Sequence, residues 1–163
     1  MNSLERTECW FVESANRILS LQLYWNQTTL KVFEFGSGSS TKYLKKYCKE
    51  LYSIDHDKEW IADGAKLCER PYNKEIEKFD NEYFDLIIVD GRDRVKCIQS
   101  SISKLKQGGW LILDNSEREY YQKGIDLMKD WNRIDCKQNR PDKYGFTYPN
   151  WTTSIFIKPD VDK

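Results

Sequence analysis

The chain lacks a long hydrophobic run, paired cysteines and an excess of charge of one sign. No stretch approaches the roughly 20 apolar residues that a membrane-spanning helix needs, so we expect no span and no membrane partner. Lysine plus arginine number 26 and aspartate plus glutamate 26, a balance that gives no long-range attraction to nucleic acid. No basic start followed by an apolar run opens the chain, so we expect no signal peptide and a cytoplasmic protein.

The cysteines are too scattered to form a disulfide framework or a zinc site. They are odd in number and never stand in a CxxC pair. We expect them to be reduced, as is usual for cytosolic proteins. The five are Cys9, Cys48, Cys68, Cys97 and Cys136.

Apolar periodicity divides the chain into alternating helices and strands. With 163 residues we expect a single domain over 1–163, in which residues 1–28 form an N-terminal helical extension. Helical spacing predicts helices over 10–25, 41–49, 58–68, 95–105 and 117–131. Short apolar runs predict strands over 30–35, 50–54, 84–89, 110–113, 133–137 and 152–157, with one further short strand over 75–79.

This alternation predicts an α/β fold, a Rossmann-like three-layer sandwich with a mostly parallel sheet. The last two strands are joined by a helix-free segment rich in Pro, Gly and Asn, residues 138–151. Such a link favours a hairpin, and we therefore expect an antiparallel C-terminal edge strand.

Carboxylates stand at four of the predicted strand ends. They occur in residues 34–41, 55–57, 90–94 and 114–115. Ligands of open parallel sheets bind outside the carboxyl ends of the strands. The sequence therefore predicts a binding site at this edge of the sheet.

The first of these segments, VFEFGSGSST, is a glycine-rich turn. A dinucleotide site requires G-x-G-x-x-G, but counting from Gly36 the third glycine position holds Thr41. No G-x-x-x-x-G-K-[ST] phosphate loop is present either. What remains is E-x-G-x-G-x-S, close to the loop of methyltransferases, although an ordinary strand-to-helix turn would also explain it.

The second strand end carries an acid at the spacing of a ribose-binding residue. Asp55 lies about 20 residues after Gly36, and a carboxylate offers two acceptor oxygens to a vicinal diol. A helix N-cap is the alternative role. We assign ribose binding to Asp55 and the cap of the predicted helix 58–68 to Asp57.

Four motifs in order, FEFGSGSST, SIDHDKEW, FDLIIVDGRDRVKCI and LKQGGWLILDNSER, resemble class I S-adenosylmethionine-dependent methyltransferases, particularly a small bacterial type with VDGR and LDNSER. The resemblance implies that Glu34 and the backbone of Gly36, Ser37 and Gly38 hold the methionine end of S-adenosylmethionine. It further implies that Asp55 binds the ribose, His56 lies beside the adenosine, and Asp90 faces the sulfonium and the acceptor.

One region departs from the family pattern. The family places an acidic or polar residue after its third strand to contact adenine, but residues 69–82 contain no clear strand. The adenine side of the site is therefore shortened or built differently. A catalytically degenerate cofactor-binding or interaction domain stays open as the alternative to an active enzyme.

The expected activity is methyl transfer to oxygen or nitrogen of a small molecule or sugar, with Asp90 and Asp114 as the catalytic residues. His56 is a weaker candidate for the base, because a lone histidine is more often a polar wall residue. Arg92 and Asn115 are predicted to contact the substrate. Pairing of Arg92 and Arg94 with acids is the structural alternative, and the candidate acids are Asp93, Glu117 and Glu119.

A divalent cation is a second alternative at the same strand ends. In catechol-type O-methyltransferases an aspartate and an Asp-Asn pair hold such an ion, and Asp90, Asp114 and Asn115 are of the same types. The positive charges of Arg92 and Arg94 disfavour it.

Two further expectations concern surfaces. The amphipathic N-terminal helix offers an interface for a homodimer. A group of aromatic side chains could contribute to an acceptor pocket; its members are Tyr120, Tyr121, Trp131, Tyr144, Phe146, Tyr148 and Trp151.

Overall fold

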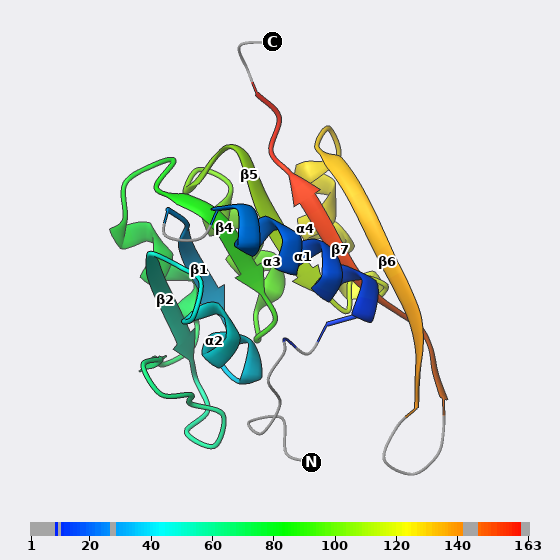
Figure 1. Cartoon of the computed structure of the whole chain (residues 1–163), viewed down its shortest axis with the longest axis horizontal. Helices are drawn as coiled ribbons and strands as arrows, with labels where there is room; N and C mark the ends of the chain where they lie inside the picture. Colours follow the sequence, from blue (N-terminus) through cyan, green and yellow to red (C-terminus); the bar gives the residue numbers. More distant parts are fainter. Residues whose placement is uncertain (1–8, 10, 27–28, 142–146, 161–163) are drawn as a thin grey trace.

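The computed structural model describes residues 9, 11–26, 29–141 and 147–160. Strands and helices alternate along the chain (Figure 1). In order they are α1 (Glu13–Asn26), β1 (Lys31–Phe35), α2 (Ser39–Leu44), β2 (Glu50–Asp55), β3 (Lys66–Leu67), the 3-10 helix η2 (Tyr72–Lys78), β4 (Phe84–Val89), α3 (Arg94–Ser101), β5 (Leu105–Asp114), the 3-10 helix η3 (Glu119–Tyr121), α4 (Gln122–Ile125), the 3-10 helix η4 (Asp126–Met128), β6 (Asn132–Pro141) and β7 (Thr147–Ile157).

The strands form one sheet in the order β3-β2-β1-β4-β5-β7-β6. Strands β1 to β5 pair in parallel, whereas β7 runs antiparallel to both β5 and β6. The predicted α/β fold, with its mostly parallel sheet and reversed C-terminal strand, is thus confirmed. The reversed strand lies one position in from the edge, and β6 forms the edge itself.

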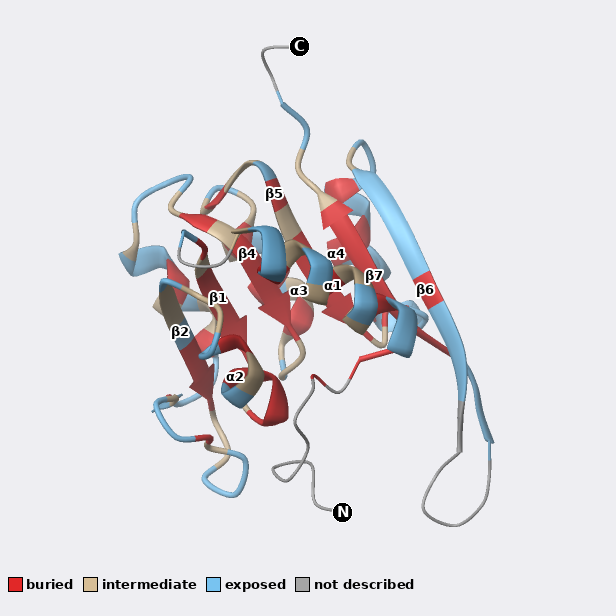
Figure 2. Ribbon diagram, in the orientation of Figure 1, coloured by how far each residue is buried: buried red, intermediate tan, exposed pale blue. Residues whose placement is uncertain are grey.

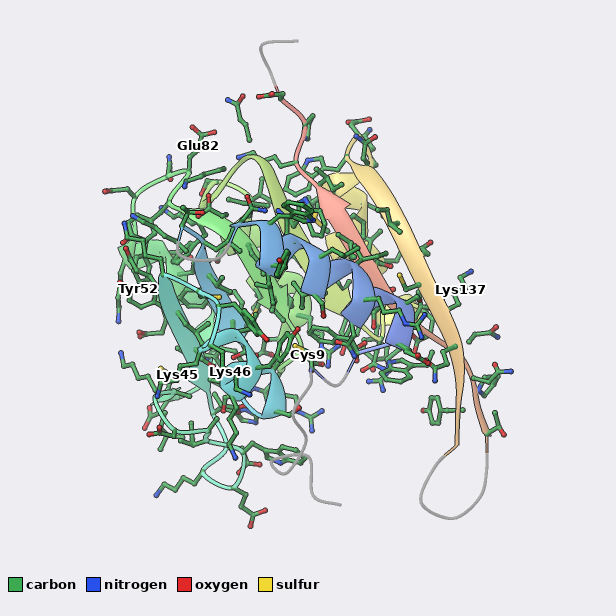
Figure 3. All side chains as sticks on the ribbon, viewed as in Figure 1. Cys9, Lys45, Lys46, Tyr52, Glu82 and Lys137 are labelled. Carbon is green, nitrogen blue, oxygen red and sulfur yellow. The ribbon has the colours of Figure 1, made fainter. Side chains whose placement is uncertain are left out.

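Helices cover both faces of the sheet, which makes three layers. On one face α1 buries Ala15, Leu19 and Leu23 against the sheet, at the spacing of one helical stripe. On the other face η2, α3 and α4 pack over side chains such as Phe33 and Ile87. Figure 2 shows the central strands buried and the edge strand β6 largely exposed. Side chains extend from both faces, and Lys137 lies on the exposed edge strand (Figure 3).

The strand order of the sheet reverses between the neighbouring strands β1 and β4, because the chain crosses over after β3. Strand β1 pairs with β2 on one side and with β4 on the other. Loops that leave the carboxyl ends of two such strands turn in opposite directions and open a crevice between them. The glycine-rich turn after β1 and the VDGR loop after β4 border that crevice.

The predicted helix over 58–68 is wrong. The segment consists of turns and ends in the two-residue strand β3. Gly64 adopts φ +88°, which breaks a helix. The Ser37 hydroxyl also fixes the turn by donating to the Trp60 carbonyl and accepting from the Ala62 N–H. Asp57 therefore caps no helix; its carboxylate accepts from the Glu59 N–H within a turn.

The predicted strand over 75–79 is also wrong, since most of these residues belong to the 3-10 helix η2. Tyr72 and Ile76 are buried on one side of it, and that one-sided burial suits a helical turn better than a strand. The helix predicted over 117–131 is broken into η3, α4 and η4. Its buried residues Tyr121, Ile125 and Met128 have a spacing that 3-10 and α turns share.

All five cysteines are free thiols. Among the described helices, none is long and apolar enough to cross a membrane.

Candidate functional site

A cavity of about 460 Å³ lies at the carboxyl ends of β1, β2, β4 and β5. Four loops line it, with residues 36–40, 55–57 and 60, 90–92 and 94, and 114, 115, 118 and 121. Every predicted site residue except Glu34 is among them. The four strand ends thus meet at one edge of the sheet, as expected, and line the same cavity.

The two glycines of the first loop have different surroundings. Gly36 has φ +96°, and a Cβ there would lie 2.7 Å from the Gly91 nitrogen. Only glycine allows the β1 and β4 loops to come this close. A Cβ on Gly38 would have no neighbour within 4 Å. Gly36 thus serves the fold, whereas the bare backbone at Gly38 leaves open space at the cavity wall.

The N–H groups of residues 36–38 are bonded within the protein. Gly36 donates to the Ile54 carbonyl at 2.8 Å, and Gly38 donates to the Thr41 hydroxyl at 3.0 Å. Ser37 donates to the Asp55 carboxylate at 2.8 Å. Residues 36–38 can therefore offer a ligand their carbonyl oxygens and the open space at Gly38.

Asp55 is a buried carboxylate fixed by backbone donors. Its Oδ1 accepts from the N–H groups of His56 and Asp57 at 2.6 and 3.0 Å, and His56 Nδ1 lies 3.0 Å away. Its Oδ2 accepts from the Ser37 N–H, and a carboxylate oxygen has a second lone pair. The side chain is thus held rigidly at the cavity wall with acceptor capacity remaining.

Glu34 lies behind the loop and does not line the cavity. It is fully buried and accepts from the hydroxyls of Ser40, Thr41 and Ser53. Burial raises the pKa of its carboxyl to about 7, although the three hydroxyls oppose that shift. The structure therefore places Glu34 as a support beneath the glycine-rich turn.

The Arg94 guanidinium links the ends of β4 and β5. Its Nε donates to the Gly91 carbonyl at 2.9 Å, and its Nη2 donates to the Asp90 carbonyl and carboxylate at 2.8 and 3.0 Å. Its Nη1 donates to the Asp114 carbonyl, and the group lies 5.2 Å from the Tyr121 ring centroid. Arg94 is thus a buried cation that holds two strand ends together.

Asp114 is buried against the reversed strand. Its Oδ1 accepts from the Trp151 indole N–H at 3.1 Å and from the Thr153 hydroxyl at 2.5 Å. Burial and, to a smaller degree, the nearby charge of Asp90 together raise the pKa of this carboxyl to about 8. Asp114 is therefore largely protonated at neutral pH.

A divalent ion does not fit these residues. The described chain contains no group of three or more His, Cys, Asp or Glu side chains arranged to hold a metal. Asp90, Asp114 and Asn115 do line one cavity, but there the Arg94 guanidinium is hydrogen-bonded to the Asp90 carboxylate and to the backbone carbonyl of Asp114. A fixed positive charge at that place repels a second cation.

Arg92 projects differently from Arg94. Its backbone N–H and carbonyl both bond the Tyr72 hydroxyl, while its side chain is exposed at the cavity. The neighbouring Asp93 pairs instead with Arg70 through two hydrogen bonds of 2.8 and 2.7 Å. In the described structure, the predicted pairing of Arg92 or Arg94 with Asp93 does not form.

The cavity wall that follows β2 is short. Strand β3 has two residues and contributes none to the cavity. Behind His56 the buried Tyr72 ring lies parallel to the imidazole, with 5.8 Å between centroids and 19° between planes. His56, Asp57 and Trp60 therefore provide this wall in place of residues after a long third strand.

The sequence reasoning misses two cavity residues, Trp60 and Arg118. Trp60 belongs to the wrongly predicted helix. Arg118 stands in the LDNSER motif, four residues after Asp114, and this closeness to a strand end could have indicated that it lines the cavity. Of the described aromatic residues proposed for the pocket, only Tyr121 lines the cavity. Tyr144 and Phe146 lie outside the described residues.

No protein-family model matches the sequence, and no curated protein matches it significantly. Solved structures of methyltransferases resemble it in fold. Precorrin-6y C5,15-methyltransferase from Geobacter metallireducens has a TM-score of 0.64 and 13% identity, over 96% of this chain and 95% of that one. An S-adenosylmethionine-dependent O-methyltransferase from Thermotoga maritima has a TM-score of 0.62 and 13% identity, over 96% of this chain and 69% of that one. An S-adenosylmethionine-dependent methyltransferase from Archaeoglobus fulgidus has a TM-score of 0.56 and 10% identity, over 90% of this chain and 94% of that one. At these identities the likeness establishes a methyltransferase-type fold.

Proposed function

We propose that the protein transfers a methyl group from S-adenosylmethionine to an oxygen or nitrogen of a small molecule or sugar. The observation that carries this proposal is the cavity at the carboxyl ends of β1, β2, β4 and β5, in which the fixed Asp55 carboxylate meets the open backbone at Gly38. A fold shared with methyltransferases supports the same function.

The cofactor side of the cavity suits the polar ends of this molecule. The remaining lone pair of Asp55 can accept from a ribose hydroxyl, and His56 and Trp60 offer flat surfaces beside it. Carbonyl oxygens of residues 36–38 can accept from an ammonium group, which is what the methionine end presents. Glu34 contributes indirectly in this scheme, because it supports the loop.

When bound, S-adenosylmethionine supplies a methyl carbon activated by its sulfonium. The protein then has to orient the acceptor and, for an alcohol, remove its proton. Asp90 and Asp114 are the acids at the acceptor side of the cavity. We assign the proton to the ionised form of Asp114, because a carboxylate whose acid has a pKa of about 8 is a stronger base than an ordinary carboxylate. Asp90, paired with Arg94, orients the acceptor, and Asn115 contacts it.

The reaction is proposed to proceed without a divalent ion. Arg94 supplies a fixed positive charge where catechol-type enzymes hold their cation. Chelator treatment should therefore leave both cofactor binding and turnover unchanged.

Calorimetric titration with S-adenosylmethionine and S-adenosylhomocysteine tests the proposal. We expect the unmodified protein to bind both, and Asp55→Ala to weaken binding by tenfold or more. Asp63→Ala is the matched control, since that carboxylate is exposed and pairs only with Lys45 among the described residues. Absence of binding to the unmodified protein would exclude the enzyme and leave the degenerate domain as the better account.

A further inference from the structure

Three arginines line the cavity on the β4–β5 side, and they differ in how many of their donors are used. Arg94 donates to five oxygen atoms: the carbonyls of Gly91, Asp114 and Asp90, the Asp90 carboxylate and, at 3.5 Å, the Asn115 side-chain oxygen. An arginine side chain has five N–H donors in a fixed fork. Arg94 is therefore satisfied within the protein and has little capacity for a ligand.

Arg92 and Arg118 retain most of their donors. The Arg92 guanidinium is exposed and makes no hydrogen bond or ion pair with any described residue. Arg118 donates once, to the Tyr120 hydroxyl at 3.0 Å, and lies 4.0 Å from a carboxylate oxygen of Glu117. That carboxylate also accepts from the Thr152 N–H, so its charge is shared.

The acids on this side neutralise the guanidinium groups of Arg92 and Arg118 only in part. Glu117 is the acid near Arg118, at 4.0 Å, and it also accepts from the Thr152 N–H. Asp90 is paired with Arg94. The raised pKa of Asp114, about 8, leaves that group mostly uncharged at neutral pH. Asp55 and Asp57 follow β2, on the other side of the crevice. The β4–β5 side is consequently positive in a chain whose net charge is zero.

We propose that Arg92 and Arg118 bind an anionic group of the methyl acceptor, either a carboxylate or a phosphate. This inference rests on the proposed methyl transfer. The two side chains come from the loops after β4 and β5, across the crevice from Asp55, and are thus separate from the ribose-binding carboxylate. Guanidinium groups bind planar or tetrahedral oxyanions through paired hydrogen bonds, which gives orientation as well as attraction.

The test uses protein saturated with S-adenosylhomocysteine and titrated with inorganic phosphate, acetate or glycerol, followed by NMR chemical shifts. We expect phosphate or acetate to bind and glycerol not to bind; whichever anion binds more tightly identifies the preferred group. Arg92→Gln and Arg118→Gln should each weaken anion binding at least fivefold and leave the affinity for S-adenosylhomocysteine within twofold. Arg17→Gln, an exposed arginine of α1, is the control and should change neither.

The outcomes separate this inference from the proposed function. If S-adenosylhomocysteine binds but neither anion does, the inference fails and the methyltransferase proposal stands. If phosphate displaces S-adenosylhomocysteine, the two arginines serve the cofactor and the inference is again overturned. If S-adenosylhomocysteine itself does not bind, both proposals fail.

Discussion

The two sides of the cavity are built by different means. On the β1–β2 side, backbone N–H groups of residues 37, 56 and 57 converge on the Asp55 carboxylate, and glycines set the shape of the wall. On the β4–β5 side, charged side chains carry the structure, with Arg94 joining Asp90 to the backbone at Asp114. The first side depends on backbone conformation and the second on charge. Substitutions should therefore have different consequences on the two sides.

The largest effect is expected from Gly36→Ala, which attacks the backbone of the first side. The new Cβ would overlap the Gly91 nitrogen at a φ that L-residues rarely adopt, so the free energy of unfolding should fall by about 3 kcal/mol or more. Urea denaturation measures it. Gly38→Ala is the matched control and should stay within about 0.5 kcal/mol while weakening cofactor binding. Equal destabilisation by the two changes would contradict the distinction between the glycines.

The corresponding change on the second side is Arg94→Met. It removes the Arg94 donor from the Asp90 carboxylate and from three carbonyls, and we expect a loss of about 3 kcal/mol in the free energy of unfolding. Arg92→Met, two residues earlier in the same loop, should change it by less than about 0.5 kcal/mol, because that guanidinium is exposed. A similar loss in both variants would show that loop strain rather than buried pairing governs this side.

A smaller effect is the pH dependence of the free energy of unfolding that arises from Asp114, on the β4–β5 side. Asp114 has a pKa of about 8 in the folded state against 3.8 ordinarily, so the folded protein binds a proton that the unfolded chain releases. Stability from this group is present at low pH and is lost as pH rises from about 4 to about 8. We expect the free energy of unfolding to fall steadily between pH 5 and pH 8.

Asp114→Asn should flatten that decline, and Asp63→Asn, at an exposed carboxylate, should leave it intact. The pKa of Glu34 is raised to about 7, so part of the slope should remain in Asp114→Asn. Stability that rises with pH over this range would refute the assignment. Turnover, by contrast, should increase as pH rises through about 8, because Asp114 must lose its proton to act as the base.

The smallest effect is expected where the two sides meet. The Tyr72 hydroxyl bonds both backbone polar groups of Arg92, while its ring lies against His56. Tyr72→Phe should lower the free energy of unfolding by about 1 kcal/mol and loosen the VDGR loop. Thermal unfolding measures the first effect and amide hydrogen exchange at residues 91–93 the second. Tyr52→Phe, at a more exposed hydroxyl, is the control; if it destabilises the protein as much, the bridge is unimportant.

The sequence predicts the strands well because burial on both faces leaves uninterrupted apolar runs. FDLIIV is the clearest case, and β4 forms over those six residues. The carboxylates that end such strands could be placed for the same reason, since parallel strands bring their carboxyl ends to one edge. Asp55, Asp90 and Asp114 accordingly reach one cavity.

What could not be predicted depends on contacts between distant segments. Residues 58–68 have the composition of a helix, but the Ser37 hydroxyl and the φ of Gly64 hold them in turns. The role of Glu34 was likewise hidden, because its three hydroxyl partners include Ser53 on another strand. Arg94 stands next to Asp93 in the chain, yet its carboxylate partner is Asp90, four residues away.

The position of β7 has a consequence for the order in which the molecule is completed. This strand lies between β5 and β6 although it is the last one in the chain, and it supplies the Trp151 and Thr153 donors to Asp114. During synthesis the parallel half of the sheet emerges from the ribosome first. Asp114 thus acquires its native environment only when the final strand inserts, so an unfinished chain would carry the Asp55 wall of the cavity before the proposed base is in place.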